Sequence, residues 1–378
     1  MTDVLVVGGG VVGLSLAWDL AGEGADVTLV DAAAVGRAAS WAGAGILPPA
    51  RVESALHPIE SLRGLANRLH VEWAEALREA TGMDTGYRRC GGVYVARTVG
   101  EEASLIGLKS LFDEEGIECR MWEGEGIRQV EPNLDPDPPV RRALWTPQEC
   151  QLRNPWHLRA LRVGCERLGV TIVEHEPIRA FEQQQGKITA ARSDRRRWYA
   201  GAYCVTAGPW SHALLEDLGL ANGILPVRGQ MVLFRSDKPL AEAIINEGTR
   251  YLVPREDGRL LAGSTEEEVG FDCRPTHDRF EELTEFACSL LPALRDAQIE
   301  AVWAGLRPGS FDGMPYMGKL PNLENAFVAS GHFRSGLSLS PAIARLMSQL
   351  ILGKQPQADW ELFRVDREAV NAGPSQPM

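Results

Sequence analysis

The stretch that decides the fold is Val4–Gly13, VLVVGGGVVG, close to the start of the chain. Its four apolar residues predict a buried strand, and its glycines predict a tight turn into a helix at about Val11–Glu23. A second apolar run, Val27–Val30, ends at Asp31. Strand, turn, helix and strand in this order predict a βαβ unit, the first part of an α/β Rossmann-type domain.

The glycine turn has the spacing G-x-G-x-x-G, which predicts a dinucleotide site. Glycine lets the turn close and lets a pyrophosphate approach the N-terminus of the helix. Asp31 stands 18 residues after the last glycine, where an acid accepts a hydrogen bond from a ribose hydroxyl. A purely structural turn is the alternative, and the motif alone does not choose between FAD and NAD. The residues expected at the pyrophosphate are Gly8, Gly10, Val11, Val12 and Gly13.

Composition limits the classes of function. A chain of 378 residues suits two domains, and a net charge of −12 argues against nucleic acid or an anionic membrane as partner. No apolar run reaches membrane-spanning length, and the first strand begins almost at the initiator Met, so we expect a cytoplasmic protein. The seven cysteines lack CxxC spacing and the histidines are scattered. We therefore expect reduced thiols and no metal.

Rossmann-like segments occur at both ends of the chain. The end returns to a strand at 326–329 and a helix at 337–352, while several strands and a helix at 279–291 precede them. Amphipathic helices are expected at 59–80 and 101–115, and another is expected to begin with Asn154 as its N-cap. We therefore predict a discontinuous nucleotide domain with an inserted β-rich substrate domain. The predicted nucleotide domain is 1–86, 146–220 and 302–378, and the predicted substrate domain is 87–145 and 221–301.

Several motifs lie far apart along the chain. They are the glycine motif Gly8–Gly13, the small-residue run Gly36–Leu47, WAGLRPG at Trp303–Gly309, DGMP at Asp312–Pro315 and GHFRSG at Gly331–Gly336. Together they resemble the D-amino-acid oxidase superfamily, and within it the glycine oxidases of thiamine biosynthesis. Two further stretches, LPVRGQ at Leu225–Gln230 and YLVPR at Tyr251–Arg255, fall between these motifs in the family's order, so the likeness spans nearly the whole chain.

This resemblance implies FAD as the cofactor, extended along the nucleotide domain with its ring between the two domains. The range 308–316 lacks the cysteine that tethers flavin in related sarcosine oxidases, so we expect noncovalent FAD. The chain before the last helix is expected under the flavin pyrimidine, where a helix N-terminus stabilises the negative charge of reduced flavin. Ser335 stands there in place of a frequent asparagine. Beyond the glycine turn, the implied cofactor residues are Asp31, Ala32, Ala38, Ala39, Ala44, Gly45, Ile46, Ile178, His332, Phe333, Arg334, Ser335, Gly336, Leu337 and Ser338.

The resemblance also implies how a substrate is held. Arg307 is expected to pair with the carboxylate of an amino acid, because a guanidinium offers two parallel hydrogen bonds. Arg334 and Tyr251 match two further groups at the same end of the pocket. No side chain is assigned as a catalytic base, and His332 is expected to be structural. One acid of the run Glu266–Glu268 is a candidate for contacting the amine, although a solvated run is the preferred interpretation.

The implied reaction is FAD-dependent oxidative deamination of glycine or another small amine. It gives an imine, then glyoxylate or another 2-oxo acid, ammonia and hydrogen peroxide, and it is expected to feed synthesis of the thiamine thiazole. The expected partners are the small substrate and O2, with a homotetramer implied by the resemblance. The alternatives are a sarcosine or D-amino-acid oxidase, a D-amino-acid dehydrogenase with a non-oxygen acceptor, an NAD-dependent dehydrogenase and a non-catalytic nucleotide-binding protein.

Overall fold

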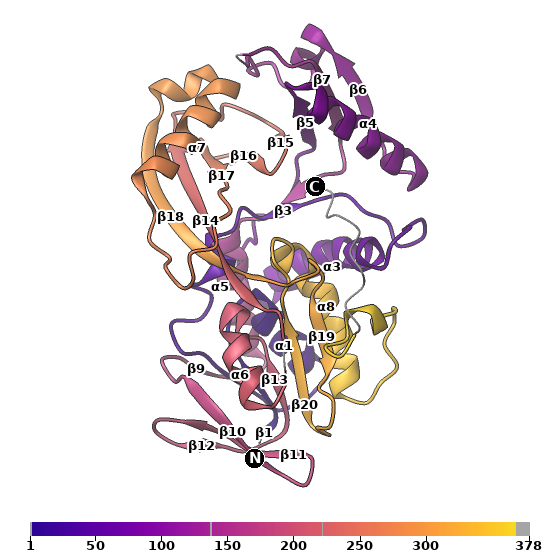
Figure 1. The fold of residues 1–378 in the computed structure, drawn as a ribbon, viewed down its shortest axis with the longest axis vertical. Coiled ribbons are helices and arrows are strands. Elements are labelled where there is room, and N and C mark those ends of the chain that lie inside the picture. Colours follow the sequence, from indigo (N-terminus) through magenta and orange to yellow (C-terminus); the bar gives the residue numbers. More distant parts are fainter. Residues whose placement is uncertain (1, 137, 221, 368–378) are drawn as a thin grey trace.

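The structure, a computed structural model, describes residues 2–136, 138–220 and 222–367. Its first sheet lies in the lower half of Figure 1 and has six strands. They are β1 (Thr2–Val7), β2 (Val27–Val30), β9 (Thr171–Val173), β13 (Ala200–Val205), β19 (Tyr316–Lys319) and β20 (Ala326–Ser330). Their order is β19-β20-β13-β1-β2-β9. All neighbours are parallel except β19, which pairs antiparallel with β20 at one edge.

Both faces of this sheet are covered. Val4 and Val6 of β1 point into a core formed with four helices, while Leu5 and Val7 point into a core on the opposite face. This alternation follows from the two-residue period of a strand. The helices are α1 (Val11–Gly22), α3 (Pro58–Thr81), α5 (Asn154–Arg167) and α8 (Gly336–Ile351). The opposite face carries β10 (Ile178–Gln184), β11 (Lys187–Ser193), β12 (Arg197–Trp198) and α6 (Ser211–Asp217).

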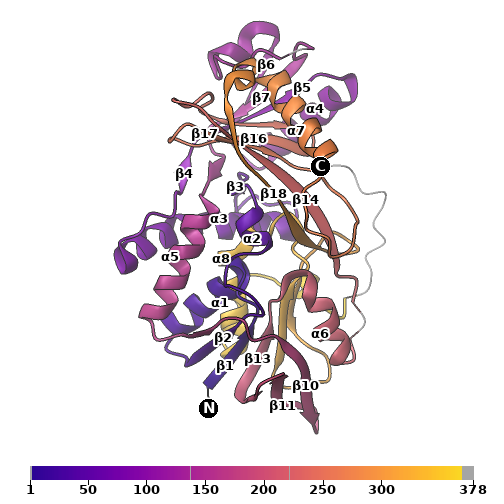
Figure 2. The same cartoon turned by 90° about the vertical axis from the view of Figure 1, so that its left-hand side faces the viewer.

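The second sheet, in the upper half of Figures 1 and 2, combines strands from two separate parts of the chain. Its order is β18-β14-β17-β16-β15-β5-β7-β6. These strands are β5 (Gly92–Ala96), β6 (Arg120–Glu123), β7 (Arg142–Thr146), β14 (Leu225–Arg235), β15 (Ile244–Glu247), β16 (Arg250–Pro254), β17 (Arg259–Gly263) and β18 (Gln298–Gly309). Helices α4 (Val99–Glu114) and α7 (His277–Leu290) pack against it.

A small sheet joins the two halves of the molecule. It has the order β3-β8-β4, with bounds Ile46–Leu47 for β3, Cys150–Gln151 for β8 and Arg88–Arg89 for β4. Its two faces differ, because successive side chains of β3 point in opposite directions. Ile46 packs beside Tyr251 and Trp303, whereas Leu47 packs beside Cys150 and Tyr87. The two residues of β3 therefore belong to two different apolar clusters, and Leu337 of α8 packs against the cluster of Leu47.

The predicted helices at 59–80, 101–115, 279–291 and 337–352 are confirmed as α3, α4, α7 and α8. The predicted N-cap is wrong, because Arg153 holds that position and Asn154 is the first residue of α5. The Asn154 side chain instead donates to the Ser40 carbonyl at 2.8 Å, so it ties α5 to a distant loop. The partition into domains stays a prediction, and β18 pairs with β14 from Gln298 to Gly309, across the predicted limit at 301/302. Within the described ranges, no helix is long and apolar enough to cross a membrane.

Candidate active site

The glycine turn connects β1 to α1 and leaves no room for side chains at two positions. Gly8 has a φ of +114°, and a Cβ there would lie 2.6 Å from the Thr206 backbone. A Cβ on Gly13 would collide with the Gly8 carbonyl oxygen. These two glycines are needed so that the strand, turn and helix can pack closely.

Gly10 differs, because the space beside it is largely open. It is the N-cap of α1, and a Cβ on it would meet only the Ser40 hydroxyl oxygen, 3.2 Å away. The Val11 N–H donates to the same hydroxyl at 2.9 Å, while the Val12 N–H belongs to the first turn and has no partner inside the helix. Space, free N–H groups and the positive end of a helix suit a phosphate. Sequence reasoning missed Ser40, although it lies in the small-residue run 36–46.

The Asp31-Ala32 pair lies directly after β2, and the carboxylate of Asp31 is held firmly. One oxygen accepts from the Gly9 N–H at 2.6 Å and the other from the Ala33 N–H at 2.7 Å. Each oxygen keeps a lone pair that a ribose hydroxyl can use. The Glu176 N–H donates to the Asp31 carbonyl at 2.9 Å, which brings the chain leading to Ile178 to the same edge of the sheet. The structure therefore brings these predicted residues together.

The run 36–47 forms the short helix α2 (Ala39–Ala42), capped by Ala38, and then enters β3. Gly45 has a φ of +82°, and a Cβ on it would collide with the Leu152 carbonyl. The Trp303 indole N–H donates at 3.0 Å to the carbonyl of the last residue of α2. Two stretches of the family resemblance, far apart in sequence, are thus in contact. Ala44–Ile46, the turn predicted to wrap the cofactor, follows directly after α2 in the first of these stretches.

Arg255 anchors this turn and was missed as a functional residue, although it ends the stretch YLVPR. It is buried, with 7% of its surface exposed. Its guanidinium donates to the Ala44 carbonyl at 2.7 Å, to the Leu152 carbonyl at 3.1 Å and to the Gln151 side chain. Burial lowers the pKa of Arg255 to about 10, so the group still carries its charge at neutral pH. Arg255 therefore holds the predicted cofactor turn against β8.

The segment His332–Ser338 leads into α8, and its backbone turns sharply at Phe333, where φ is +46°. Ser335 is the N-cap of α8, but its side chain makes no capping hydrogen bond. The first N–H groups of α8 are therefore available to a ligand. His332 is buried, and among the described residues its Nε2 has no hydrogen-bond partner. Burial lowers the pKa of His332 to about 3, so the ring is neutral and a weak base.

Arg307 lies on β18 with its guanidinium directly over Gly229 of β14. A Cβ on Gly229 would collide with that guanidinium, so the glycine in LPVRGQ makes room for it. Arg307 donates to the Ser264 hydroxyl at 2.7 Å and to the Thr265 carbonyl at 3.1 Å. Burial lowers the pKa of Arg307, but a guanidinium stays protonated. The group is thus held in one orientation with N–H donors to spare.

Arg334 and Tyr251 lie near Arg307, as the resemblance implies. The guanidinium carbon of Arg334 is 5.9 Å from the centre of the Tyr251 ring. Arg334 donates to the Thr249 carbonyl at 2.7 Å and pairs with Glu266 at 3.3 Å. Tyr251, Arg334 and Glu266 all influence the pKa of Arg307, which places the four groups in one electrostatic cluster. The cluster has two positive charges and one negative charge.

The acidic run does not behave as a single solvated segment. Glu266 takes part in the cluster described above, and Glu268 is exposed. Glu267 pairs with the buried Arg228 at 2.8 Å and accepts from Gln230 at 2.9 Å. The solvated interpretation is therefore wrong for Glu267, whose carboxylate neutralises a buried arginine next to Gly229.

The residues present suit FAD by three observations. Gly10 leaves space at the N-terminus of α1, α8 has an uncapped N-terminus, and His332 keeps an unpartnered ring nitrogen. The N-terminus of α1 would hold the pyrophosphate of FAD, and the N-terminus of α8 and His332 would lie near its ring. Within the described ranges, no three His, Cys, Asp or Glu side chains gather where they could hold a metal.

Comparison with known proteins agrees with this arrangement. Residues 3–350 match the model of a family described as DAO, FAD dependent oxidoreductase. The chain therefore belongs to the DAO family of FAD-dependent oxidoreductases. Glycine oxidase of Pseudomonas putida is 34% identical over 369 residues, which cover 94% of this chain and 96% of that protein. The bifunctional protein ThiO/ThiG of Synechocystis sp. is 34% identical over 362 residues, covering 94% of this chain and 52% of that protein.

Solved structures give the same picture. The crystal structure of glycine oxidase from Geobacillus kaustophilus superposes with a TM-score of 0.93 and 29% identity, covering 97% of this chain and 99% of that one. The predicted fold class and the predicted cofactor, FAD, are confirmed. The roles of the individual site residues stay predictions.

Proposed function

We propose that this protein is an FAD-dependent oxidase of glycine or a similarly small amine. The observation that carries the proposal is the place of Arg307. Its strand, β18, also carries Trp303, whose indole N–H donates a hydrogen bond to the Ala42 carbonyl of α2, beside the predicted flavin turn. A carboxylate bound by Arg307 is therefore close to that turn. The glycine oxidases among the relatives support glycine as the substrate.

The side chains of this site bind and orient, and none acts as a strong base. Arg307 takes the substrate carboxylate through two parallel N–H donors, while Tyr251 and Arg334 close the same end of the pocket. Glu266, which partly neutralises Arg334, offers a carboxylate to the substrate ammonium. Bound FAD supplies the acceptor for a hydride from the substrate α-carbon. Overall, glycine, O2 and water become glyoxylate, ammonia and hydrogen peroxide.

Anaerobic mixing of the FAD-loaded enzyme with glycine, sarcosine and D-alanine tests the proposal. We expect glycine to bleach the visible flavin absorbance and air to restore it with one hydrogen peroxide per turnover. If none of the three amines bleaches the flavin, the proposal is wrong. If the flavin is bleached but reoxidises through a quinone with little peroxide, the protein is an amino-acid dehydrogenase instead.

The same resemblance supports further expectations. The relatives named ThiO/ThiG favour a role in supplying the thiazole of thiamine. We also infer noncovalent FAD, a cytoplasmic location and a homotetramer. Precipitation with acid should release the flavin into the supernatant, and light scattering should give four times the chain mass of 41.3 kDa.

A further inference from the structure

His70, a buried histidine outside the predicted site residues, donates a hydrogen bond to the first turn of α8. It lies on α3 with 2% of its surface exposed, and its Nε2 is 2.9 Å from the Ser338 carbonyl oxygen. A carbonyl oxygen can only accept, so Nε2 carries the proton. Burial lowers the pKa of His70 to about 4, so the ring is neutral at neutral pH and has this one N–H.

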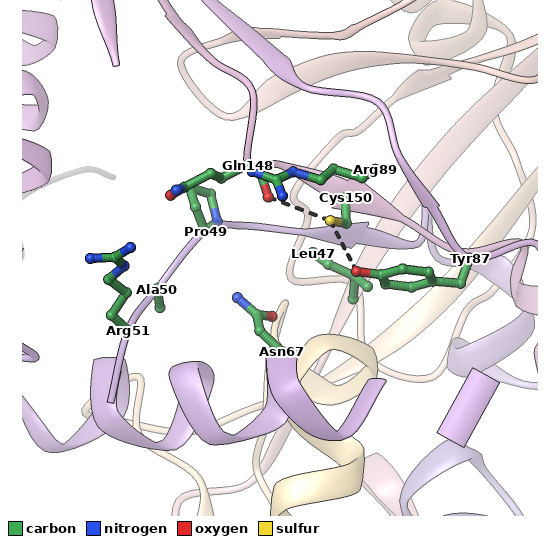
Figure 3. A pocket seen from close by; sticks show the side chains of 9 residues that line it. All are labelled: Leu47, Pro49, Ala50, Arg51, Asn67, Tyr87, Arg89, Gln148 and Cys150. Atoms are coloured by element: carbon green, nitrogen blue, oxygen red, sulfur yellow. Dashed lines mark hydrogen bonds between the residues drawn. The ribbon is translucent and has the colours of Figure 1, made fainter. Parts of the chain in front are cut away.

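The helix that carries His70 is fixed beside the predicted flavin segment. Asn67, one turn earlier on α3, donates to the Pro48 carbonyl at 2.8 Å, and Figure 3 shows its side chain pointing from α3 toward the segment that carries Leu47. Leu337 of α8 packs against the cluster of Leu47. Helix α3 is thus tied to the same part of the protein as the first turn of α8, and His70 meets that turn from a fixed position.

A chain of hydrogen bonds runs from His70 to the N-terminus of α8. The imidazole donates to the Ser338 carbonyl, and the N–H of the same peptide unit, on Leu339, donates to the Ser335 carbonyl at 2.9 Å. The peptide unit of that second carbonyl contains the N–H of Gly336, the first residue of α8. This N–H has no partner inside the helix, and the Ser335 side chain does not cap it. Each hydrogen bond in a chain polarises the next, so His70 acts on an N–H that is available to a ligand.

The contact is made where α8 lacks an internal hydrogen bond. Pro341 has no N–H, so the Leu337 carbonyl loses the donor that a regular helix supplies four residues later. The Ser340 hydroxyl donates to this carbonyl at 2.9 Å, and the same carbonyl affects the pKa of His70. The first turn of α8 therefore depends on side-chain donors, and His70 supplies one of them from another helix.

We propose that His70 is a positioning residue for the flavin: its hydrogen bond orients and polarises the first turn of α8, which strengthens the donor that faces the flavin pyrimidine. A stronger donor there favours the reduced flavin, because reduction places negative charge on that part of the ring. The inference rests on the predicted place of FAD at this helix and not on glycine being the substrate.

His157 of α5 provides a matched control within the same core. Its ring centre is 6.0 Å from that of His70, and it is equally buried, with 2% exposed. Within the described part of the chain, neither of its ring nitrogens has a hydrogen-bond partner. His157 therefore shares the surroundings of His70 but not the hydrogen bond to α8.

Equilibration of the FAD-loaded enzyme with a redox dye tests the proposal without any amine substrate. At a fixed ratio of reduced to oxidised dye, the ratio of reduced to oxidised flavin in His70→Leu should fall about threefold from wild type, since polarisation changes a charged hydrogen bond by a fraction of its strength. His70→Gln keeps an N–H donor at a similar distance from the backbone and should restore most of this ratio. His157→Leu should leave the ratio unchanged.

A ratio for His70→Leu equal to that of wild type overturns the proposal, and so does an equal fall in His157→Leu or in His70→Gln. If His70→Leu does not fold, His70→Phe, which keeps a ring without a donor, takes its place with the same expected result. Histidine ¹⁵N NMR of the wild type is an independent check, because a proton on Nδ1 instead of Nε2 of His70 overturns the proposal by itself. Failure of glycine to bleach the flavin bears only on the proposed function.

Discussion

Replacing Arg307 by glutamine removes the group that the proposed function needs most. A guanidinium has five N–H donors. Two of those of Arg307 are already used, on the Ser264 hydroxyl at 2.7 Å and the Thr265 carbonyl at 3.1 Å. A side-chain hydrogen bond to Tyr251 uses a third donor. Two donors remain, which is the number that a substrate carboxylate needs. The glutamine of Arg307→Gln has one amide group, no charge and too short a side chain to bridge the same distance.

The expected loss follows from these contacts. Hydrogen bonds to charged groups contribute about 1.5–3 kcal/mol each, and they are not fully additive, so we expect a loss of roughly 2–4 kcal/mol. This corresponds to a decrease in kcat/KM of about 30- to 900-fold. Ser264→Ala should cost only about 1 kcal/mol, close to fivefold, because Thr265 still orients the guanidinium.

Peroxide-coupled steady-state kinetics with glycine, on protein of matched flavin content, measures this effect. Most of the decrease should come from a higher KM, because the carboxylate is bound in both the ground state and the transition state. The flavin absorbance spectrum before glycine is added should show that FAD is still bound. A kcat/KM for Arg307→Gln within about threefold of wild type, far below the expected loss, would refute the assignment of the carboxylate site.

Three other changes test other parts of the structure. Gly13→Ala should release FAD and lower the melting temperature, because the added Cβ collides with backbone. Gly22→Ala in the same helix is the control, because its Cβ meets nothing within 4 Å and should stabilise the protein by about 0.5–1 kcal/mol. Flavin fluorescence and thermal melting separate the two variants, and equal behaviour would contradict the role of the turn. Arg255→Met should raise the Kd for FAD at least about tenfold, because the buried carbonyls of Ala44 and Leu152 lose their hydrogen-bond donor. Flavin titration of the apoprotein measures this Kd, and an unchanged value would show that Arg255 does not support the cofactor turn. His70 and His157 are buried, and burial lowers their pKa values to about 4 and about 3. The unfolded chain therefore binds more protons below about pH 6.5, and stability should fall as pH decreases from there toward 4, by roughly 1 kcal/mol per histidine at about pH 5.5. Denaturant unfolding of His157→Leu should show a smaller decrease, and an identical pH dependence would contradict this account.

Much of the nucleotide domain could be predicted from local sequence. The strand, turn and helix that begin at Val4–Gly13 can pack only if the turn has no side chains at certain positions, so glycine is required there. The spacing of these glycines is visible in the sequence alone. The helices α3 and α8 were predictable for a similar reason, because an amphipathic or apolar repeat lies within one continuous segment. The role of Asn154 was not predictable, since a residue of cap type before a proline can also bond a distant carbonyl, as it does at Ser40.

The predicted substrate site also combines features that its sequence motif indicates with features that only the fold decides. Arg307 was found through its motif, but its orientation depends on Gly229 and on the Ser264–Thr265 turn, which lie on other strands. Arg255 was missed because an arginine at the end of a strand is usually a surface residue. Its role is visible only in the folded protein, where Arg255 donates hydrogen bonds to the carbonyls of Ala44 and Leu152, which are distant in sequence.

The sequence by itself thus determined the βαβ start and the dinucleotide turn, because each depends on residues a few positions apart, and the family resemblance of its motif made Arg307 the predicted carboxylate-binding residue. Tertiary structure alone decided how Arg307 is held and that Glu267 neutralises Arg228. These features arise where strands from distant parts of the chain pair in one sheet. Burial and hydrogen bonding across such pairs depend on register and twist, which no local pattern of residues specifies.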